Sequence, residues 1–484
     1  MATPIPINHC AFDAAEIVRA TGATRSNSTD LRVEGVSIDS RTIAAGALFV
    51  ALRGIRDGHE FLAAAAERRA AGAIVERGRT YRGLECFEVE DTLAALGGLA
   101  RLHLERTRAR HQLAVVTIGG AAGKTSTKEL TAAVAHALFG EILVTPGNLN
   151  NRIGVPMTIL TLDDAQHAAV LECGTNQQNE IARLAAIVKP DVALVLNVDI
   201  EHTEGLGSLE GVADEEASMF AAARVAVTAA DEPMLIARIP AGMRTVTFSD
   251  GSPADVRVIR RTVVAPGRQQ VTLALAPAMV EAGVEPQIDA TLSLLGAVCA
   301  SNAAAAVAAA ASAYSRPLGR DQLAAIARAL AGVQPVEGRL STSQIAAAIV
   351  IDDTYNANPR SVRSALAAAR ETADGLHARL VVAMGDMLEL GALAAQMHIE
   401  IVREIFRARP DALIAVGPEM AAAVRQHPVA KSNDTPPILE LARDSAEAAA
   451  TVAAIVHPND VVLVKGSRGI AMERIIDFLK QSNR

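Results

Sequence analysis

Residues 113–130 read LAVVTIGGAAGKTSTKEL, an apolar run that ends at glycines and continues into a helix-like segment. This order is typical of a phosphate loop, in which a buried strand leads to a turn whose backbone N–H groups face an anion. In that interpretation Lys124 reaches the terminal phosphates and Thr125 holds a magnesium ion. The usual loop has a glycine where Ile118 stands, so a strand-to-helix turn with a solvated lysine is the alternative.

Length and composition limit the class of protein. The chain has 484 residues, which predicts about three domains. Its net charge of −8 argues against a nucleic-acid partner, whose phosphates require a basic surface. The four scattered cysteines fit neither a zinc site nor a disulfide framework. No signal peptide or spanning run is recognised, and the alanine tract at 303–311 is expected in a packed helix, so we expect a soluble, cytoplasmic protein.

The order of strand-like and helix-like segments predicts an α/β fold of three domains. Residues 1–90 form a small α/β unit. Residues 91–315 place the phosphate loop in a mostly parallel sheet, followed by three alternating segments that predict an antiparallel annex. Residues 316–484 resume the alternation as a doubly wound, Rossmann-like unit, although no GxGxxG marks a dinucleotide site.

Two polar residues follow strands of the central unit, at the sheet edge where such folds bind ligands. Glu172 ends a buried strand and is placed to hold Mg²⁺ directly or through water. His202 follows the next strand; a lone histidine is more often structural, but here it converges with Thr125 and Glu172 on one edge. We therefore expect a metal site there.

Three further clusters allow both a binding and a structural interpretation. Ser40 and Arg41 fit a phosphate or a uracil edge, or else a helix cap with an ion pair. The segment GNLNNRIG at 147–154 suits recognition of a polar substrate, or a turn with Asx caps. KGSR at 465–468 suits a carboxylate or phosphate, or is a solvated loop.

The third unit adds residues suited to a transfer reaction. Arg339 can stabilise charge on a transferring phosphate from a separate domain, which requires closure. The segment DDTYNANP at 352–359 follows a buried strand. MGDMLELG at 384–391, with His398 beyond it, lies at the carboxyl end of another strand.

Together these segments resemble the ATP-dependent Mur ligases over nearly the whole chain. The resemblance rests on DSRTIAAGALFVALRGIRDGHEF (39–61), GAAGKTSTKE (120–129), GNLNNRIGVP (147–156), EGLGSLEGVA (204–213), GRL (338–340), DDTYNANPRS (352–361), MGDMLELG (384–391) and KGSRGIAME (465–473). Among the members, YNANP favours the one whose incoming substrate is D-alanyl-D-alanine.

The resemblance implies an activity and a division of labour. The first domain would bind the UDP end of UDP-N-acetylmuramoyl-tripeptide, the central one ATP and Mg²⁺, and the third D-alanyl-D-alanine. A tripeptide carboxylate would attack the γ-phosphate of ATP, and the dipeptide amine would displace phosphate from the acyl phosphate, leaving ADP, phosphate and a new amide. A monomer with no nucleic-acid partner and no membrane insertion is expected.

The resemblance also implies site residues. The residues expected in catalysis are Lys124, His202 and Arg339. Those expected to bind ATP are Gly120, Ala121, Ala122, Gly123, Lys124, Thr125, Ser126, Asn302, Arg339 and Asp353. The expected metal ligands are Thr125, Glu172 and His202, with Glu216 as a further candidate. The expected substrate-binding residues are Ser40, Arg41, Asn148, Asn151, Tyr355, Asn356, Asn358, Lys465, Ser467 and Arg468.

Departures from the family's pattern cluster in the central domain. Glu216 stands where the family usually has a lysine modified to a carbamate, so its carboxylate ends about 4 Å short at roughly 1.5 Å per bond. Val298 and Cys299 replace a His-Asn pair, although Asn302 is kept. These changes motivate two alternatives: a diverged member that joins a different amino acid or dipeptide, and a non-catalytic nucleotide-sugar-binding protein.

Overall fold

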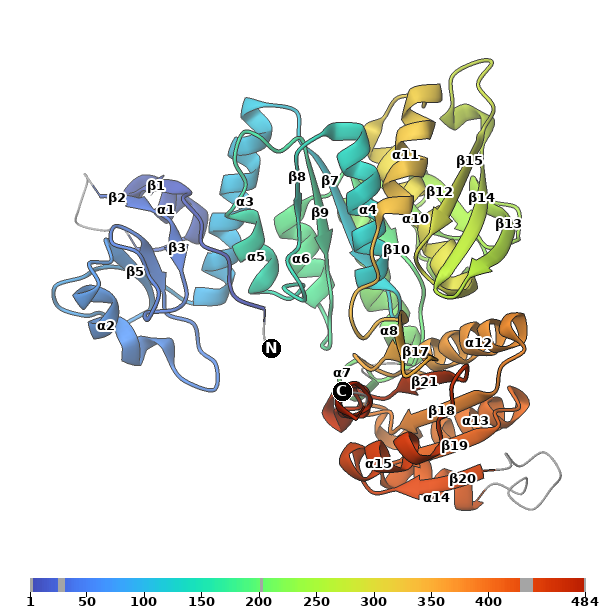
Figure 1. Ribbon diagram of the computed structural model, residues 1–484. Coiled ribbons are helices and arrows are strands. Elements are labelled where there is room, and N and C mark those ends of the chain that lie inside the picture. Colours follow the sequence, from blue (N-terminus) through green and yellow to red (C-terminus); the bar gives the residue numbers. More distant parts are fainter. Residues whose placement is uncertain (1–2, 25–30, 201–202, 427–437, 483–484) are drawn as a thin grey trace.

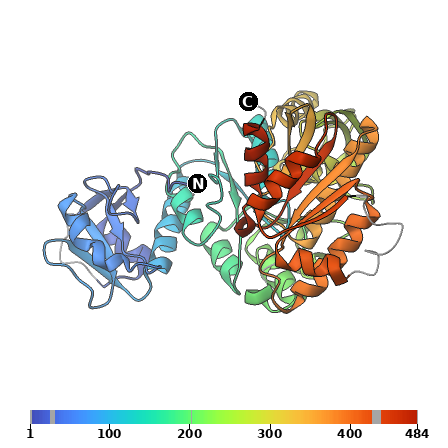
Figure 2. The same cartoon turned by 60° about the horizontal axis from the view of Figure 1, so that its bottom comes forward.

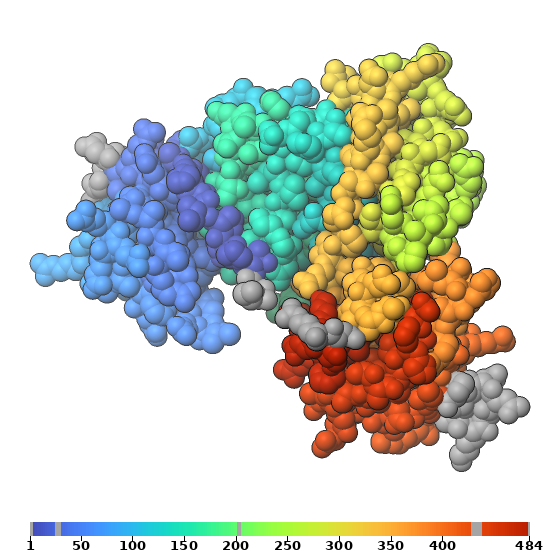
Figure 3. All heavy atoms as spheres, in the orientation of Figure 1, coloured from blue at the N-terminus to red at the C-terminus, as the bar shows by residue number. Residues whose placement is uncertain are grey.

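The computed structural model in Figure 1 has three α/β units that follow one another along the chain. The structure describes residues 3–24, 31–200, 203–426 and 438–482. Both outer units adjoin the central one and stand apart from each other in the space-filling view of Figure 3. Figure 2 shows the N-terminal unit projecting to one side of the other two. The predicted α/β class with three domains is confirmed, and the exact boundaries at 90 and 315 stay predictions.

The N-terminal unit combines a two-stranded antiparallel sheet with a four-stranded parallel sheet in the order β3-β4-β5-β6. Its elements are β1 (Ala11–Asp13), α1 (Ala14–Thr21), β2 (Arg32–Glu34), β3 (Val36–Ser37), β4 (Leu48–Val50), α2 (Leu62–Glu67), β5 (Gly72–Glu76) and β6 (Glu85–Val89). Helix α1 begins where Asp13 and Glu16 form a reciprocal capping box and ends at Gly22, whose φ of 69° suits glycine.

The central unit is built on a nine-stranded sheet in the order β15-β14-β13-β12-β11-β10-β7-β9-β8. Its strands are β7 (Ala114–Gly119), β8 (Ile142–Val144), β9 (Ala168–Glu172), β10 (Val192–Val195), β11 (Val225–Ala229), β12 (Arg244–Ser249), β13 (Val256–Ala265), β14 (Arg268–Leu275) and β15 (Gln287–Leu292). All pairs from β8 to β13 are parallel, and β13, β14 and β15 are antiparallel, which confirms the predicted annex.

Helices cover both faces of the central sheet (Figure 1). One face carries α4 (Lys124–Phe139), α10 (Gly296–Tyr314) and α11 (Arg320–Gly332). The other carries α3 (Thr92–Arg110), α5 (Gly154–Ile159), α6 (Glu180–Val188) and α8 (Leu209–Ala217). The short helices α7 (Thr203–Leu206) and α9 (Pro233–Ile236) follow β10 and β11. Helix α11 packs on α4 and β15, so it lies with the central sheet although it follows residue 315.

Helix α10 is the centre of the molecule's largest apolar cluster. It is long and apolar enough to cross a membrane, yet 78% of its most apolar window is buried inside the protein. Its alanines let α4 approach closely on one side and the C-terminal unit on the other, because a small side chain keeps helix axes near. The predicted packed helix at 303–311 is therefore confirmed as a core helix.

The C-terminal unit has a six-stranded sheet in the order β16-β17-β21-β18-β19-β20, parallel except for β16. Its strands are β16 (Ser341–Ile345), β17 (Ala348–Asp353), β18 (Leu380–Gly385), β19 (Ala412–Val416), β20 (Ile438–Ala442) and β21 (Val461–Lys465). Its helices are α12 (Pro359–Leu376), α13 (Ala394–Arg407), α14 (Pro418–Gln426), α15 (Ser445–Ile455) and α16 (Glu473–Gln481). Helix α12 faces the central unit and packs against α10 (Figure 1).

Candidate active site

The loop between β7 and α4 has the backbone of an anion site. Gly120 and Gly123 have φ angles of 116° and 89°, a region that favours glycine. A Cβ at Gly120 would lie 2.9 Å from the backbone nitrogen of Leu196, so the loop can pass this neighbour only without a side chain. Helix α4 begins directly after Gly123. The predicted strand, glycine turn and helix are therefore present.

The backbone N–H groups of residues 120–122, in the first part of the loop, donate hydrogen bonds to other parts of the protein. The N–H of Gly120 donates to Glu216 Oε2 at 2.7 Å. The N–H of Ala121 donates to the carbonyl of Asn197 at 3.0 Å, and that of Ala122 to Asn197 Oδ1 at 2.8 Å. These three N–H groups thus have protein acceptors, and the expected role of Gly120, Ala121 and Ala122 in ATP binding stays a prediction.

The remaining donors lie at the start of α4. The N–H groups of Gly123, Lys124, Thr125 and Ser126 belong to the helix cap and first turn, where no intrahelical acceptor is available. With the positive end of the helix dipole they form the part of the loop suited to phosphate. Lys124 Nζ lies over the loop, 2.5 Å from the Gly120 carbonyl and 3.3 Å from that of Ala121.

A second lysine on α4 was missed in the sequence. Lys128 is 1% exposed, and its Nζ donates to the carbonyls of Thr145 at 3.0 Å and Gly147 at 3.2 Å. It therefore anchors the start of the amide-rich segment 147–154 against the helix that carries the phosphate loop. The signal was weak because a lysine inside a polar helix sequence is normally solvent-exposed.

The edge of β9 presents an oxygen site. Glu172 is 1% exposed; its Oε1 accepts from Thr125 Oγ1 at 3.2 Å and from Asn150 Nδ2 at 2.8 Å. Its Oε2 is buried and has no hydrogen-bond partner within the described residues. A buried, unpartnered carboxylate oxygen beside a hydroxyl fits Mg²⁺, which binds through one or two protein oxygens and completes its shell with phosphates and water.

Two further metal ligands were predicted. His202 lies outside the described residues. Glu216 is 2% exposed and sits behind the phosphate loop, where Oε2 meets Gly120 N, and it does not line the cavity. The described part of the chain has no cluster of three histidine, cysteine or acidic side chains that would bind a metal without substrate oxygens.

The three amides of segment 147–154 play different parts. Asn151 Oδ1 accepts from the backbone N–H groups of Ile153 and Gly154, in the turn that leads into α5. Asn148 Oδ1 accepts from Thr3 Oγ1 at 2.8 Å. Neither lines the cavity, whereas Asn150, absent from the expected substrate residues, reaches Glu172 within it.

The opposite wall comes from the C-terminal unit. Asp352 and Asp353 at the end of β17 accept from the backbone N–H groups of Gly338 and Leu340, both at 3.1 Å. These bonds hold the segment that carries Arg339, whose guanidinium lies 4.0 Å from the centre of the Tyr355 ring. Burial raises the pKa of the Asp352 carboxyl above its usual range.

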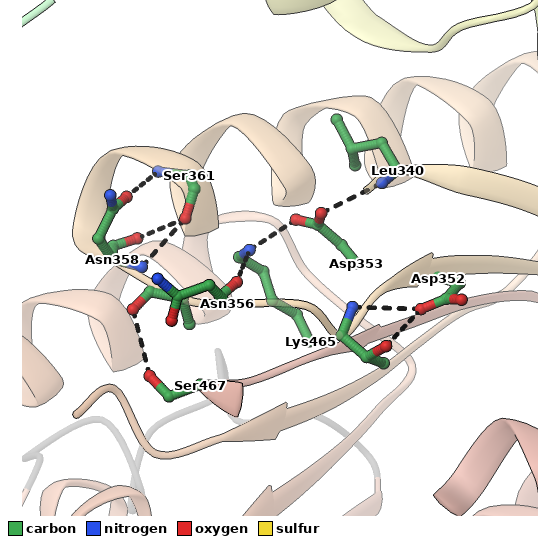
Figure 4. A network of polar contacts seen from close by, with 10 residues as sticks. Leu340, Asp352, Asp353, Asn356, Asn358, Ser361, Lys465 and Ser467 are labelled. Atoms are coloured by element: carbon green, nitrogen blue, oxygen red, sulfur yellow. Dashed lines mark hydrogen bonds and ion pairs between the residues drawn. The ribbon is translucent and has the colours of Figure 1, made fainter. Parts of the chain in front are cut away.

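Lys465 joins β21 to this wall. It is 1% exposed, and Nζ donates to Asp353 Oδ2 at 2.6 Å and to the Asn356 carbonyl at 2.8 Å (Figure 4). Asn358 caps α12 by accepting from Ser361 N at 2.8 Å. Lys465 therefore fixes the shape of the segment 352–359, so the solvated-loop alternative is wrong for this residue.

A cavity of about 260 Å³ brings these two walls together. Most predicted ATP, metal and substrate residues line it: Ala121, Ala122, Gly123, Lys124, Thr125, Ser126, Glu172, Asn302, Arg339, Asp353, Tyr355, Asn356, Asn358 and Lys465. Sequence reasoning missed Asn150, Asn197, Arg360, Ser361 and Ser364, which also line it. Val298 and Cys299 line it as well, and burial raises the pKa of the Cys299 thiol to about 12.

A smaller hollow of about 70 Å³ shares Asn356 and Asn358 with this cavity. Arg468 and the segment 388–390 line it too. That segment is held in place by Ser467 Oγ, which accepts from Leu388 N at 2.8 Å, and by buried His398, whose Nε2 accepts from Met387 N at 2.9 Å. His398 is therefore a support of this wall.

Ser40 and Arg41 lie in the N-terminal unit and line neither cavity. Ser40 is 7% exposed. The exposed Arg41 guanidinium pairs with Asp39 at 2.7 Å and holds the pKa of that carboxyl below its usual value. The ion pair of the structural interpretation is thus formed.

Comparison with known proteins links this geometry to one family. Residues 118–310 match the Mur ligase middle domain, and residues 338–468 match the Mur ligase glutamate ligase domain. UDP-N-acetylmuramoyl-tripeptide--D-alanyl-D-alanine ligase of Escherichia coli is 34% identical over 463 residues, covering 94% of this chain and 95% of the relative. The enzyme of the same name from Mycobacterium tuberculosis is 32% identical, covering 96% of each chain. The chain is a Mur ligase.

Solved structures show the Mur ligase fold over nearly the whole chain. A crystal structure of MurF from Acinetobacter baumannii has a TM-score of 0.84 at 29% identity and covers 98% of this chain and all of that one. MurF ligase from Thermotoga maritima, solved in complex with ADP, has a TM-score of 0.78 at 25% identity, covering 92% and 97%. Both walls of the Mur ligase cavity lie within the two matched domains, since Lys124 and Glu172 belong to the first and Arg339 and Asp353 to the second.

Proposed function

We propose that this Mur ligase adds D-alanyl-D-alanine to UDP-N-acetylmuramoyl-tripeptide, converting ATP to ADP and phosphate. The observation that carries the proposal is the single cavity in which the phosphate loop of the central unit faces Arg339, Asp353 and Lys465 of the C-terminal unit. Relatives that bear this name match nearly the full chain. The two walls supply an anion site and a separate polar corner, as a two-step ligase requires.

The phosphate side supports the first step. A tripeptide carboxylate oxygen attacks the γ-phosphorus of ATP, the bond to ADP breaks, and an acyl phosphate forms. The N–H groups of residues 123–126 and the Lys124 ammonium offset the phosphate charge. Arg339 lines the same cavity from the C-terminal unit, and its guanidinium is suited to stabilise charge on the transferring phosphate.

Mg²⁺ fits the oxygen site, where Thr125 and Glu172 would hold it and where it would neutralise phosphate charge. Asn150 orients the Glu172 carboxylate through its contact with Oε1. The same contact uses Oε1 and leaves the buried Oε2 available as a metal ligand.

The smaller hollow suits the dipeptide. Its amine attacks the acyl carbon, phosphate leaves with the bonding electron pair, and the amine proton passes to phosphate or water. Arg468 is the cation suited to the dipeptide carboxylate, and Asn356 and Asn358 line both the hollow and the cavity. The N-terminal unit, with Ser40 and Arg41, is assigned to the UDP end.

Phosphate release tests the proposal directly. Wild type is assayed with ATP, Mg²⁺ and UDP-N-acetylmuramoyl-tripeptide, with and without D-alanyl-D-alanine, beside Lys124→Ala and the surface control Lys480→Ala. We expect dipeptide-dependent release in wild type and Lys480→Ala and its loss in Lys124→Ala. Mass spectrometry of the product identifies the new amide.

Two outcomes would support the alternatives. Release that depends on another amino acid or dipeptide, found by substrate profiling, would assign a diverged activity. Tight calorimetric binding of the UDP substrate with no ATP affinity and no release would assign a non-catalytic binding protein, as the Val298 and Cys299 replacements suggested. Sedimentation of the same preparations checks the expected monomer.

A further inference from the structure

The contact between α12 and the central unit carries a feature that the activity does not explain. Arg360 is the second residue of α12 and follows the segment that lines the dipeptide hollow. Its backbone N–H donates to Asp199 Oδ2 at 2.8 Å. Its guanidinium donates to Glu232 Oε2 at 2.9 Å and to the Val198 carbonyl at 3.3 Å.

These three bonds converge on the chain segment that grips the phosphate loop. Val198 and Asp199 directly follow Asn197, whose carbonyl and side chain hold the N–H groups of Ala121 and Ala122. Glu232 Oε2 also accepts from Val198 N at 3.3 Å, so one carboxylate ties this segment and Arg360 together. The Glu232 side chain is 14% exposed, which limits solvent screening on its side of the pair.

A second ion pair on α12 provides a contrast. Arg261 of β13 pairs with Glu371 near the other end of the helix at 2.7 Å. It joins the same two units, but neither residue lines the cavity or contacts the phosphate loop. The Arg261–Glu371 pair therefore holds the two units together without reaching the phosphate loop, whereas the Arg360–Glu232 pair does both.

We infer that Arg360 is a positioning residue that links the dipeptide hollow to the phosphate loop. Through its bonds to Val198 and Glu232, the Arg360 side chain couples the position of α12 to the position of Asn197 and the phosphate loop. Dipeptide and nucleotide therefore bind cooperatively, each raising the affinity of the other by the same factor. This inference rests on the proposed function, because it takes the hollow as the dipeptide site.

The test measures the linkage itself. Isothermal titration gives the Kd of a nonhydrolysable ATP analogue with and without saturating D-alanyl-D-alanine, for wild type, Arg360→Ala and Glu371→Gln. We expect the dipeptide to tighten nucleotide binding about fivefold or more in wild type and Glu371→Gln, a typical size for coupled sites. In Arg360→Ala the ratio should fall close to one. Arg360→Lys, which keeps the Glu232 pair but not the guanidinium fork, should retain part of it.

Three results would overturn the inference. One is an Arg360→Ala variant in which the dipeptide still tightens nucleotide binding by the wild-type factor. If its nucleotide Kd is weaker as well, Arg360 contacts nucleotide directly and does not link the two sites. A second is equal loss in Glu371→Gln, which would indicate general contact between the units. The third is a wild-type protein that releases phosphate in the presence of dipeptide although the dipeptide does not change its nucleotide Kd. Absence of dipeptide-dependent release in wild type overturns the proposed function itself and is recognised separately in that assay.

Discussion

The oxygen site at Glu172 depends on one hydroxyl. Thr125→Val keeps the shape of the side chain but removes the oxygen that faces Glu172. We expect the factor by which Mg²⁺ tightens nucleotide binding to be about tenfold smaller in this variant than in wild type. That factor corresponds to about 1.4 kcal/mol, the strength of an ordinary charge-assisted contact. Titrations with and without Mg²⁺ check it.

The matched control is Thr127→Val on the same helix. Thr127 is fully buried, and its hydroxyl has no partner within the described residues. Its replacement should leave the Mg²⁺ effect unchanged. Equal behaviour of the two variants would contradict the assignment of Thr125 to the metal.

Asp352 gives the protein a pH dependence of known sign. Burial raises the pKa of this carboxyl in the folded state, so the folded protein holds its proton more tightly than the unfolded chain. The contribution of Asp352 to the free energy of unfolding is fully present below the pKa of the unfolded chain, about 3.9. It declines as pH rises through the raised pKa of the folded state. The loss of stability in Asp352→Asn should therefore be larger at pH 4 than at pH 7, as measured by urea unfolding. A loss that grows with pH would contradict it.

At the scale of elements, the phosphate loop and α4 act as one unit. Gly123→Ala puts a side chain at φ 89°, with its Cβ 3.2 Å from Asn302 Oδ1. We expect a stability loss of about 1 kcal/mol from the left-handed backbone and at least a tenfold loss of nucleotide affinity, because the first N–H groups of α4 shift.

Gly140→Ala at the other end of α4 controls for the backbone strain. Gly140 has φ 81° and ψ −129°, a region more restricted for alanine than the left-handed region of Gly123, and a Cβ there would meet nothing within 4 Å. Gly140→Ala should lose at least as much stability yet bind nucleotide normally. Calorimetric titration and thermal melting of both variants separate the two effects.

Elements with a strong hydrophobic pattern were predictable from the sequence, and weakly patterned ones were not. Buried strands such as β7, β18 and β21 are short apolar runs between turns, so their position was clear. Strands β16 (STSQI) and β20 (ILELA) at the edges of the C-terminal sheet have one buried residue each and were missed. Edge strands are partly solvent-exposed, so a polar sequence such as that of β16, or a short run interrupted by Glu440 as in β20, gives a weak strand signal.

The candidate site was predictable to the same extent. Residues in the glycine loop and at strand ends were found because motif and topology place them. Asn150 could not be told from Asn148 and Asn151, since only the turn geometry decides which amide points into the cavity. Arg360 was also out of reach, because its partners are more than a hundred residues away.

At the scale of the whole molecule, the C-terminal unit is seated through α10 and α12. Gly296 lies at their contact, where a Cβ would come within 2.9 Å of the Ala368 Cβ. Gly296→Val should push the units apart, raise the radius of gyration in small-angle scattering, and abolish dipeptide-dependent phosphate release while binding of the UDP substrate persists.

Gly242→Val is the control for this change. Gly242 has φ 78°, close to the 81° of Gly296, but a Cβ there has open space. It should share the backbone strain and keep the compact shape and phosphate release. A compact Gly296→Val protein with normal release would show that the units are seated by other contacts.

The bracing of the phosphate loop by Glu216 and Asn197 has a kinetic consequence. A loop that is set before nucleotide arrives loses little conformational entropy on binding, so the phosphate contacts are retained as affinity. The same readiness applies to the product. ADP meets the same pre-formed loop as ATP and therefore also binds tightly. We expect ADP to compete with ATP for the site, and an excess of ATP over ADP in the cell would relieve this competition.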